Sequence, residues 1–177
     1  VENVISGCHK WSQMVSKYLV DKTSLFILGK GKMEGISKEG ALKIKEIGYI
    51  HSEGYSSSSL KHGPFSLLEK GFPIIMIISK NNATLHSKLI NSYQEIKCRG
   101  AEIFIITNDS NCNQFKNNLS NKPSNNQFNH TLIIPFNQKY NEILSVIPLQ
   151  MIAYYLAIEK GHNPDFPRNL AKVVTVE

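Results

Sequence analysis

The feature that most restricts the fold of this chain is a series of short, unbroken apolar runs. They occupy Ser24–Gly29, Pro73–Ser79, Ala101–Thr107 and Thr131–Phe136. A run without polar alternation is typical of a strand that is buried on both faces, as in a parallel sheet. Because longer segments separate the runs, the sequence predicts β-α-β units with right-handed crossovers.

Segments with helical periodicity lie between these runs. Apolar residues recur at three- and four-residue steps from Glu2 to about Lys22, and helices are also predicted over about 33–47, 82–99 and 140–160. The last of these is apolar nearly all round, so we expect it to be buried against the sheet. A further extended segment at Tyr49–Tyr55 brings the expected sheet to about five strands.

We therefore predict an α/β fold with three layers: a flavodoxin-like, doubly wound parallel sheet with helices on both faces. The 177 residues fit a single domain over 1–177. Within it, the asparagine-rich segment 109–129 is predicted to be a surface excursion, and 162–177 a C-terminal tail that is not regular helix. Ligands of such sheets gather at the carboxyl ends of the strands, and we expect the polar groups of 39–64 to lie at that edge.

The composition indicates which classes of binding partner and cofactor to expect. The formal net charge of +6 suits an anionic partner, but the lysines are scattered, which favours a local anion site over nucleic acid. No apolar run approaches the roughly 20 residues that cross a bilayer, so we expect a soluble, cytoplasmic protein without a membrane partner. Three widely spaced cysteines, Cys8, Cys98 and Cys112, indicate neither a disulfide framework nor a zinc site. We expect no metal and no cofactor.

The segment EGALKIKEI is the main candidate for chemistry. Glu39, Lys43 and Glu46 are four and three residues apart, so on a helix they share one face. Such a stripe is more often a set of solvated ion pairs. Here, however, Gly40 and Ala41 leave the neighbouring surface flat, which would let a ligand or another subunit approach closely.

Further positions complete a possible isomerase site. A carboxylate could move a proton between adjacent carbons, a lysine could stabilise an enediol-like anion, and His62 could open a sugar ring. A histidine before Gly-Pro is more often a turn residue, and Lys172 in a prolyl tail is more often a surface lysine. The glycines of 29–35 fit no nucleotide-binding spacing, so close packing is the favoured explanation, and the serines of 56–59 are more often a loop than a phosphate site.

Three long stretches of the sequence carry a family resemblance: LGKGKMEGISKEGALKIKEIGYIHSEGY, SLKHGP and the terminal PLQMIAYYLAIEKGHNPDFPRNLAKVVTVE. They resemble the carboxyl-terminal sugar-isomerase (SIS) domain of the glucosamine-6-phosphate synthase family, over nearly the whole chain. The resemblance implies the second of two SIS domains in an enzyme that makes glucosamine 6-phosphate from fructose 6-phosphate and glutamine. The implied partners are sugar phosphates, a first SIS domain, a glutaminase domain that releases ammonia, and a second copy in a homodimer.

The resemblance also implies roles for individual residues. Glu46 matches the base that shuttles a proton between C1 and C2, and Lys43 matches the lysine beside it. His62 matches a ring-opening histidine supplied by the neighbouring subunit, and Lys172 matches a lysine that forms an imine with the open-chain ketose. Two further positions are expected either to bind the substrate or to support the catalytic residues: Glu39, a carboxylate on the same motif, and Ala171.

The resemblance also indicates what this chain lacks. The family's main phosphate-gripping loop belongs to the first SIS domain, so the chain alone is expected to be inactive. Ser58 and Ser59 stand where the family commonly has Gly-Glu before LKHGP. The alternative function is a non-catalytic regulatory SIS module that binds sugar phosphate, which would need no proton shuttle and no imine-forming lysine.

Overall fold

The computed structural model describes residues 1–111 and 130–169. Ala171, Lys172, Cys112, most of the asparagine-rich excursion and the end of the tail lie outside the described residues. The helices and strands are α1 (Glu2–Leu19), β1 (Ser24–Gly29), α2 (Lys32–Lys43), β2 (His51–Ser56), β3 (Pro73–Ile78), α3 (Ala83–Lys97), β4 (Glu102–Thr107), β5 (Thr131–Ile133) and α5 (Asn141–Glu159). Three short turns of other helix types complete them: a π-helical turn η1 (Ile44–Gly48), and the 3₁₀ turns η2 (Ser59–His62) and η3 (Pro64–Leu67).

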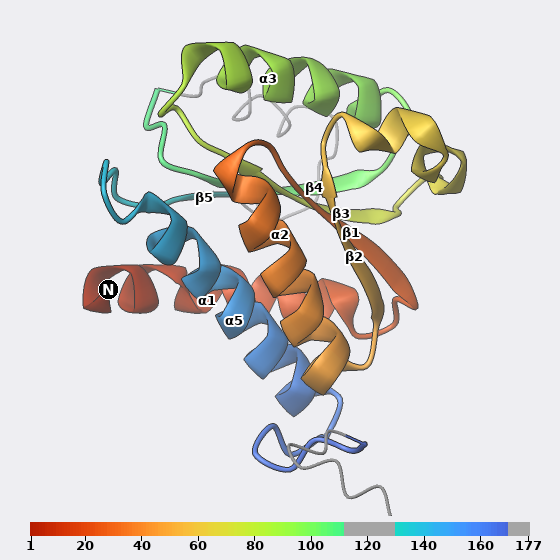
Figure 1. The fold of residues 1–177 in the computed structure, drawn as a ribbon. Coiled ribbons are helices and arrows are strands. Elements are labelled where there is room, and N and C mark those ends of the chain that lie inside the picture. Colours follow the sequence, from red (N-terminus) through yellow and green to blue (C-terminus); the bar gives the residue numbers. More distant parts are fainter. Residues whose placement is uncertain (112–129, 170–177) are drawn as a thin grey trace, which may run out of the picture.

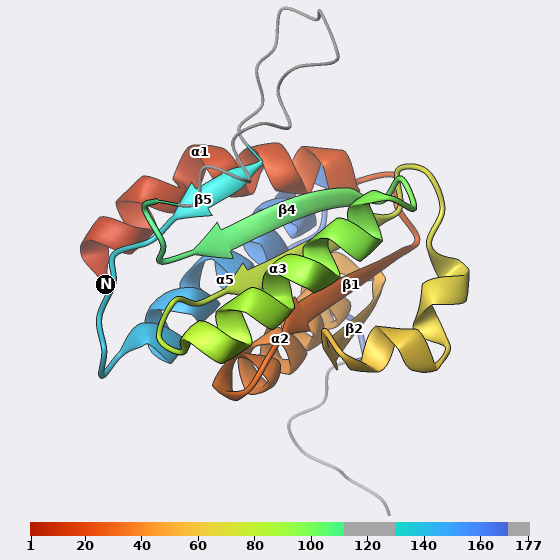
Figure 2. The same ribbon diagram turned by 90° about the horizontal axis from the view of Figure 1, so that it is seen from above.

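The five strands form one parallel sheet in the order β2-β1-β3-β4-β5. This is the flavodoxin-like strand order, so the predicted fold class is confirmed. Helices α1, α2 and α5 cover one face of the sheet and α3 covers the other, which gives three layers (Figures 1 and 2).

Two apolar cores, one on each face of the sheet, account for the unbroken apolar runs. Successive residues of a strand point to opposite faces. In β1, Ile27 packs in the core beneath α1, α2 and α5, while Phe26 and Leu28 pack in the core beneath α3. Both faces are buried, so the positions between the ends of the central strands are apolar.

Several element ends differ from the sequence prediction by a few residues, and three of the differences are informative. The helix expected over 33–47 is α-helical only to Lys43 and then continues as the π-helical turn η1. Tyr49 follows in a left-handed conformation (φ 51°), so β2 begins at His51 and not at Tyr49. The last strand stops at Ile133, because Pro135 has no N–H to continue the ladder.

Helix α5 is the long, mostly apolar helix that the sequence predicts over about 140–160. Within the described part of the chain, it is the one helix long and apolar enough to cross a membrane, by length and composition. Of that apolar window, 56% is buried inside the protein, where α5 packs between α1 and α2 (Figure 1). Its composition is therefore explained by its place in the core.

Candidate functional site

The Lys43 cluster, which we define as Glu39, Lys43 and Glu46, forms at the end of α2. The Lys43 Nζ lies 2.7 Å from Glu46 Oε2 and 3.7 Å from Glu39 Oε1. The predicted common face is thus confirmed. The Lys43 and Glu46 side chains are only 33% and 20% exposed, so this pair is not a fully solvated surface contact. The hydrogen bond to Glu46 raises the pKa of Lys43, so it favours the charged ammonium form.

The small residues beside this cluster have a different role from the one expected. Gly40 and Ala41 are buried, and a Cβ on Gly40 would lie 3.1 Å from the Cβ of Leu149 in α5. They let α2 and α5 pack closely. The expectation that they leave a flat surface for a ligand was therefore wrong.

The Lys43 cluster and His62 lie at opposite edges of the sheet. Helix α2 begins after the carboxyl end of β1 and returns to the start of β2, so the cluster lies at the amino edge. His62 follows the carboxyl end of β2 and is exposed. The length of β2 alone separates the two by roughly 20 Å. The expected common location at the carboxyl edge was wrong for Lys43 and Glu46, and a site that uses both His62 and Glu46 needs His62 from another copy.

Tyr49 holds the described beginning of the tail. The backbone N–H of Arg168 donates to Tyr49 Oη at 2.8 Å, and the Arg168 guanidinium carbon lies 4.2 Å from the centre of the Tyr49 ring. The ring of His162 packs against the same tyrosine at 4.8 Å between centroids. The tail therefore starts next to the residues that follow Glu46. No sequence pattern singled out Tyr49.

Lys160, at the C-terminal end of α5, makes a second connection to this region. Its Nζ donates to the carbonyl oxygen of Gly48 at 3.0 Å. Burial lowers the pKa of Lys160, and the positive charge of Arg168 lowers it further. Lys160 thus connects α5 to the end of the π-helical turn, and the tail contacts Tyr49, the residue that follows this turn.

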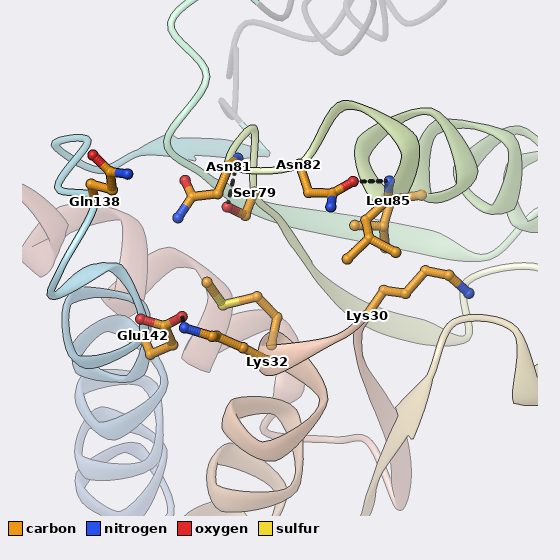
Figure 3. Close-up of a pocket in the computed structure, with 10 residues that line it drawn as sticks. Lys30, Lys32, Ser79, Asn81, Asn82, Leu85, Gln138 and Glu142 are labelled. Atoms are coloured by element: carbon orange, nitrogen blue, oxygen red, sulfur yellow. Dashed lines mark hydrogen bonds and ion pairs between the residues drawn. The ribbon is translucent and has the colours of Figure 1, made fainter.

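A separate cavity of about 360 Å³ opens at the carboxyl edge of the sheet. We call it the switch-point cavity, because it lies where the chain leaves β1 on one side and β3 on the other. Figure 3 shows it between the N-terminal ends of α2, α3 and α5. Its lining residues are Lys30, Lys32, Met33, Ser79, Asn81, Asn82, Leu85, Leu89, Gln138 and Glu142.

The two lysines of this cavity point in opposite directions (Figure 3). Lys32 Nζ lies 3.7 Å from Glu142 Oε1, and Lys30 Nζ donates to Ser58 Oγ. Between them, Gly31 precedes α2 with φ 62°, a conformation that glycine adopts without steric cost. It caps α2 without a side chain, so the first-turn amides of α2 have no side-chain capping partner.

A buried polar network fixes the opposite wall of the cavity. Asn108 Nδ2 donates to Asn141 Oδ1 at 2.7 Å and to Asn81 Oδ1 at 3.0 Å. Asn141 Nδ2 in turn donates to Ser79 Oγ at 3.2 Å. Asn108 and Asn141 are almost fully buried, so Ser79 and Asn81 are held in place from inside the protein. The sequence analysis missed this cavity, because three segments that are far apart along the chain contribute to it: 30–33, 79–89 and 138–142.

The residues that the structure describes give little indication of a metal site or of a reactive thiol. Over 1–111 and 130–169, no group of three or more His, Cys, Asp and Glu side chains could hold a metal ion. Burial raises the pKa of Cys8, which makes its thiol unreactive, and Cys98 is free and exposed.

Comparison with known proteins places this architecture in a family. The sequence profile of the SIS domain family matches residues 18–160. A probable glutamine--fructose-6-phosphate aminotransferase of Acanthamoeba polyphaga mimivirus is 44% identical over 164 residues, covering 91% of this chain and 24% of the viral protein. The corresponding enzyme of Sulfolobus acidocaldarius is 40% identical, covering the whole chain and 27% of the archaeal protein. The chain thus spans about a quarter of the length of these relatives.

Solved structures agree with the sequence comparison. The C-terminal domain of glucosamine-fructose-6-phosphate aminotransferase from Francisella tularensis matches with a TM-score of 0.75 at 30% identity, covering 92% of this chain and 44% of that one. A putative phosphosugar isomerase from Clostridium difficile shares the fold, with a TM-score of 0.72 at 19% identity, over 95% of this chain and 43% of that one. The sequence profile and the relatives at 40–44% identity therefore show that this chain belongs to the SIS domain family.

Proposed function

We propose that this chain is the second SIS domain of a cytoplasmic enzyme that forms glucosamine 6-phosphate from fructose 6-phosphate and glutamine. The names of its relatives and the match to a C-terminal aminotransferase domain support this assignment. The first SIS domain and a glutaminase domain would complete the polypeptide, and two copies would form a homodimer. In this arrangement the chain supplies catalytic groups and the first SIS domain supplies the phosphate grip.

The close contact between Lys43 and Glu46 is the observation that carries the proposal. Isomerisation of a C2 imine requires removal of a proton from C1 and its return to C2. Glu46, as a carboxylate, takes and returns that proton. Lys43, a cation in direct contact with Glu46, stabilises the negative charge that develops between the two steps. Glu39 adds a second carboxylate that holds Lys43 in position.

The tail and His62 complete the proposed site. Lys172 would attack C2 of the open-chain ketose and form an imine with loss of water, and ammonia from glutamine would then replace the lysine amine at C2 before the proton transfer. Ala171 beside it would contact the substrate. The packing of Arg168 on Tyr49 supports this role, because it starts the tail beside the residues that follow Glu46. His62, exposed at the opposite edge, would open the sugar ring in the site of the neighbouring subunit.

Substitutions in the complete enzyme test the proposal. Glu46→Gln keeps the size of the side chain but removes the base, so we expect synthase activity to fall by roughly 10² to 10⁴-fold. Lys172→Ala should abolish it by removing the imine. Lys45→Ala is the matched control, because Lys45 lies exposed on the same π-helical turn. Substantial glucosamine 6-phosphate formation by either active-site variant would refute the assignment.

A second assay separates the enzyme from a regulatory module. Borohydride reduces an imine to a stable secondary amine, so an enzyme incubated with fructose 6-phosphate should gain the mass of the reduced sugar phosphate on Lys172. A regulatory SIS module would bind the sugar phosphate without this adduct.

A further inference from the structure

We infer that Tyr49 is a positioning residue of the proposed reaction, which holds the start of the tail so that Lys172 reaches the site that contains Glu46. The inference rests on the proposed function and gives Tyr49 a role distinct from those of the base and the imine-forming lysine. Tyr49 lies three residues after Glu46 and contacts Arg168, which lies four residues before Lys172. It therefore joins the turn that carries the base to the segment that leads to the lysine.

Two residues of the tail contact the Tyr49 side chain in three ways. The backbone N–H of Arg168 donates to the hydroxyl oxygen at 2.8 Å, and the guanidinium carbon lies 4.2 Å from the ring centre. The His162 ring meets the tyrosine ring edge to face, with 4.8 Å between centroids and 61° between planes. A hydrogen bond, a cation–π contact and a ring contact thus converge on one side chain, and together they fix the tail.

The backbone on both sides of this contact supports a functional role. Tyr49 has φ 51° and ψ 40°, and Asn169, next to Arg168, has φ 59°. They are the non-glycine residues with a positive φ in the ranges 1–111 and 130–169. This conformation is unfavourable for a residue with a Cβ, and more so for tyrosine than for asparagine. Glycine at position 49 would avoid the strain, but it would lack the ring and hydroxyl that hold the tail.

The turn on which Tyr49 stands is fixed by α5. Lys160 Nζ donates to the carbonyl oxygen of Gly48 at 3.0 Å. Gly48 is buried, and a Cβ there would lie 2.6 Å from Leu156 Cδ2, so the end of the turn lies directly on α5. The position of Tyr49 relative to Glu46 is therefore set by contacts with α5. A side chain held in this way can serve as a rigid support for the tail.

The short chain between Arg168 and Lys172 makes this support effective. Four residues extend at most about 14 Å, so fixing Arg168 keeps Lys172 within that distance of it. An earlier anchor, the His162 N–H that donates to Ala157 O at 2.8 Å, leaves ten residues, which can extend to about 35 Å. Confining a nucleophile raises its effective concentration at the carbonyl carbon, and the rate of attack rises with it.

Tyr49 variants of the complete enzyme test the inference in a timed borohydride assay. The enzyme is mixed with fructose 6-phosphate without glutamine, borohydride is added after set intervals, and the adduct on Lys172 is measured by mass spectrometry. Tyr49→Phe keeps the ring but removes the hydrogen-bond acceptor, so it should slow adduct formation about fivefold. Tyr49→Leu also removes the ring and should slow it about 30-fold or more. In both variants KM for fructose 6-phosphate should change by about twofold or less, because the phosphate grip is assigned to the first SIS domain.

Tyr140→Phe is the matched control, because it removes the same hydroxyl from an exposed tyrosine at the other end of α5. It should leave the rate of adduct formation unchanged. Adduct formation at the parental rate in both Tyr49 variants would overturn the inference. So would an unchanged adduct rate with loss of glucosamine 6-phosphate, since Tyr49 would then act on Glu46 and not on the tail. A parent enzyme that forms neither adduct nor product would instead refute the proposed function, and this inference with it.

Discussion

Gly54→Ala should strongly destabilise the protein, because β2 and α2 approach most closely at this glycine. A Cβ on Gly54 would lie 2.5 Å from Lys38 Cα and 2.6 Å from Ser37 C, whereas ordinary contacts are 3.4–4 Å. The neighbouring atoms belong to the backbone, so α2 must move away as a unit by about 1 Å. Overpacking typically costs about 1–3 kcal/mol, and we expect a value near the upper limit, about 3 kcal/mol.

Urea denaturation followed by far-UV circular dichroism measures this cost. With a denaturant slope of about 2 kcal/mol per molar, a loss of about 3 kcal/mol lowers the midpoint by about 1.5 M. Gly35→Ala is the control on the same helix, because a Cβ there meets open space. It should stabilise the protein by about 0.5–1 kcal/mol through helix propensity. An unchanged midpoint for Gly54→Ala, or a lower one for Gly35→Ala, would refute the packing argument.

Three further predictions concern single contacts. Glu46→Gln should lower the pKa of Lys43, measured by NMR titration of its side chain, because the hydrogen bond that raises this pKa is weakened. In the unsubstituted protein, the pKa of Lys43 is higher in the folded state than in the unfolded chain, where it is about 10.4, so this residue stabilises the fold at pH values below about 10.4. The stabilisation is lost as the pH rises through the pKa of Lys43 in the folded state. Tyr49→Phe should speed amide hydrogen exchange at Arg168, since the acceptor at 2.8 Å is removed, while costing about 1 kcal/mol or less in global stability. Asn141→Leu should cost about 1–3 kcal/mol in thermal unfolding, because it leaves buried polar partners unsatisfied.

Each of these predictions has a contrary outcome. An unchanged or higher pKa of Lys43 in the glutamine variant would mean that Glu46 does not control its charge. Unchanged exchange at Arg168 would show that the tail is fixed by other contacts. An Asn141 variant as stable as the parent would mean that water or a rearranged side chain satisfies the network.

The central strands β1, β3 and β4 were predictable because they are buried on both faces. In β3, for example, all six positions are buried, and the strand Pro73–Ile78 differs from the predicted run, Pro73–Ser79, by one residue. The residues at which strands begin and end could not be predicted from hydrophobic periodicity, because they depend on the backbone conformation of single residues. Pro135 shortened the last strand, and the left-handed Tyr49 delayed β2.

The candidate site was predictable only where its residues are close in sequence. Helical spacing was sufficient to bring Lys43 to Glu46, because the contact spans three residues. Gly40 was misassigned to ligand access, since its neighbour Leu149 lies in a distant helix. Tyr49 and the switch-point cavity were missed for the same reason: their contacts join segments that are far apart along the chain.

The π-helical turn makes the length of one segment more important than its composition. Exposed Lys45 can be exchanged for many residues, but its deletion would move Glu46 from three positions after Lys43 to two. Residues two apart point to different sides of a helix. A deletion of one codon would therefore separate the Glu46 carboxylate from the Lys43 ammonium group, although the gene would still encode both residues. Relatives of this chain that keep both residues but differ in the spacing between them should be treated as having lost the pair.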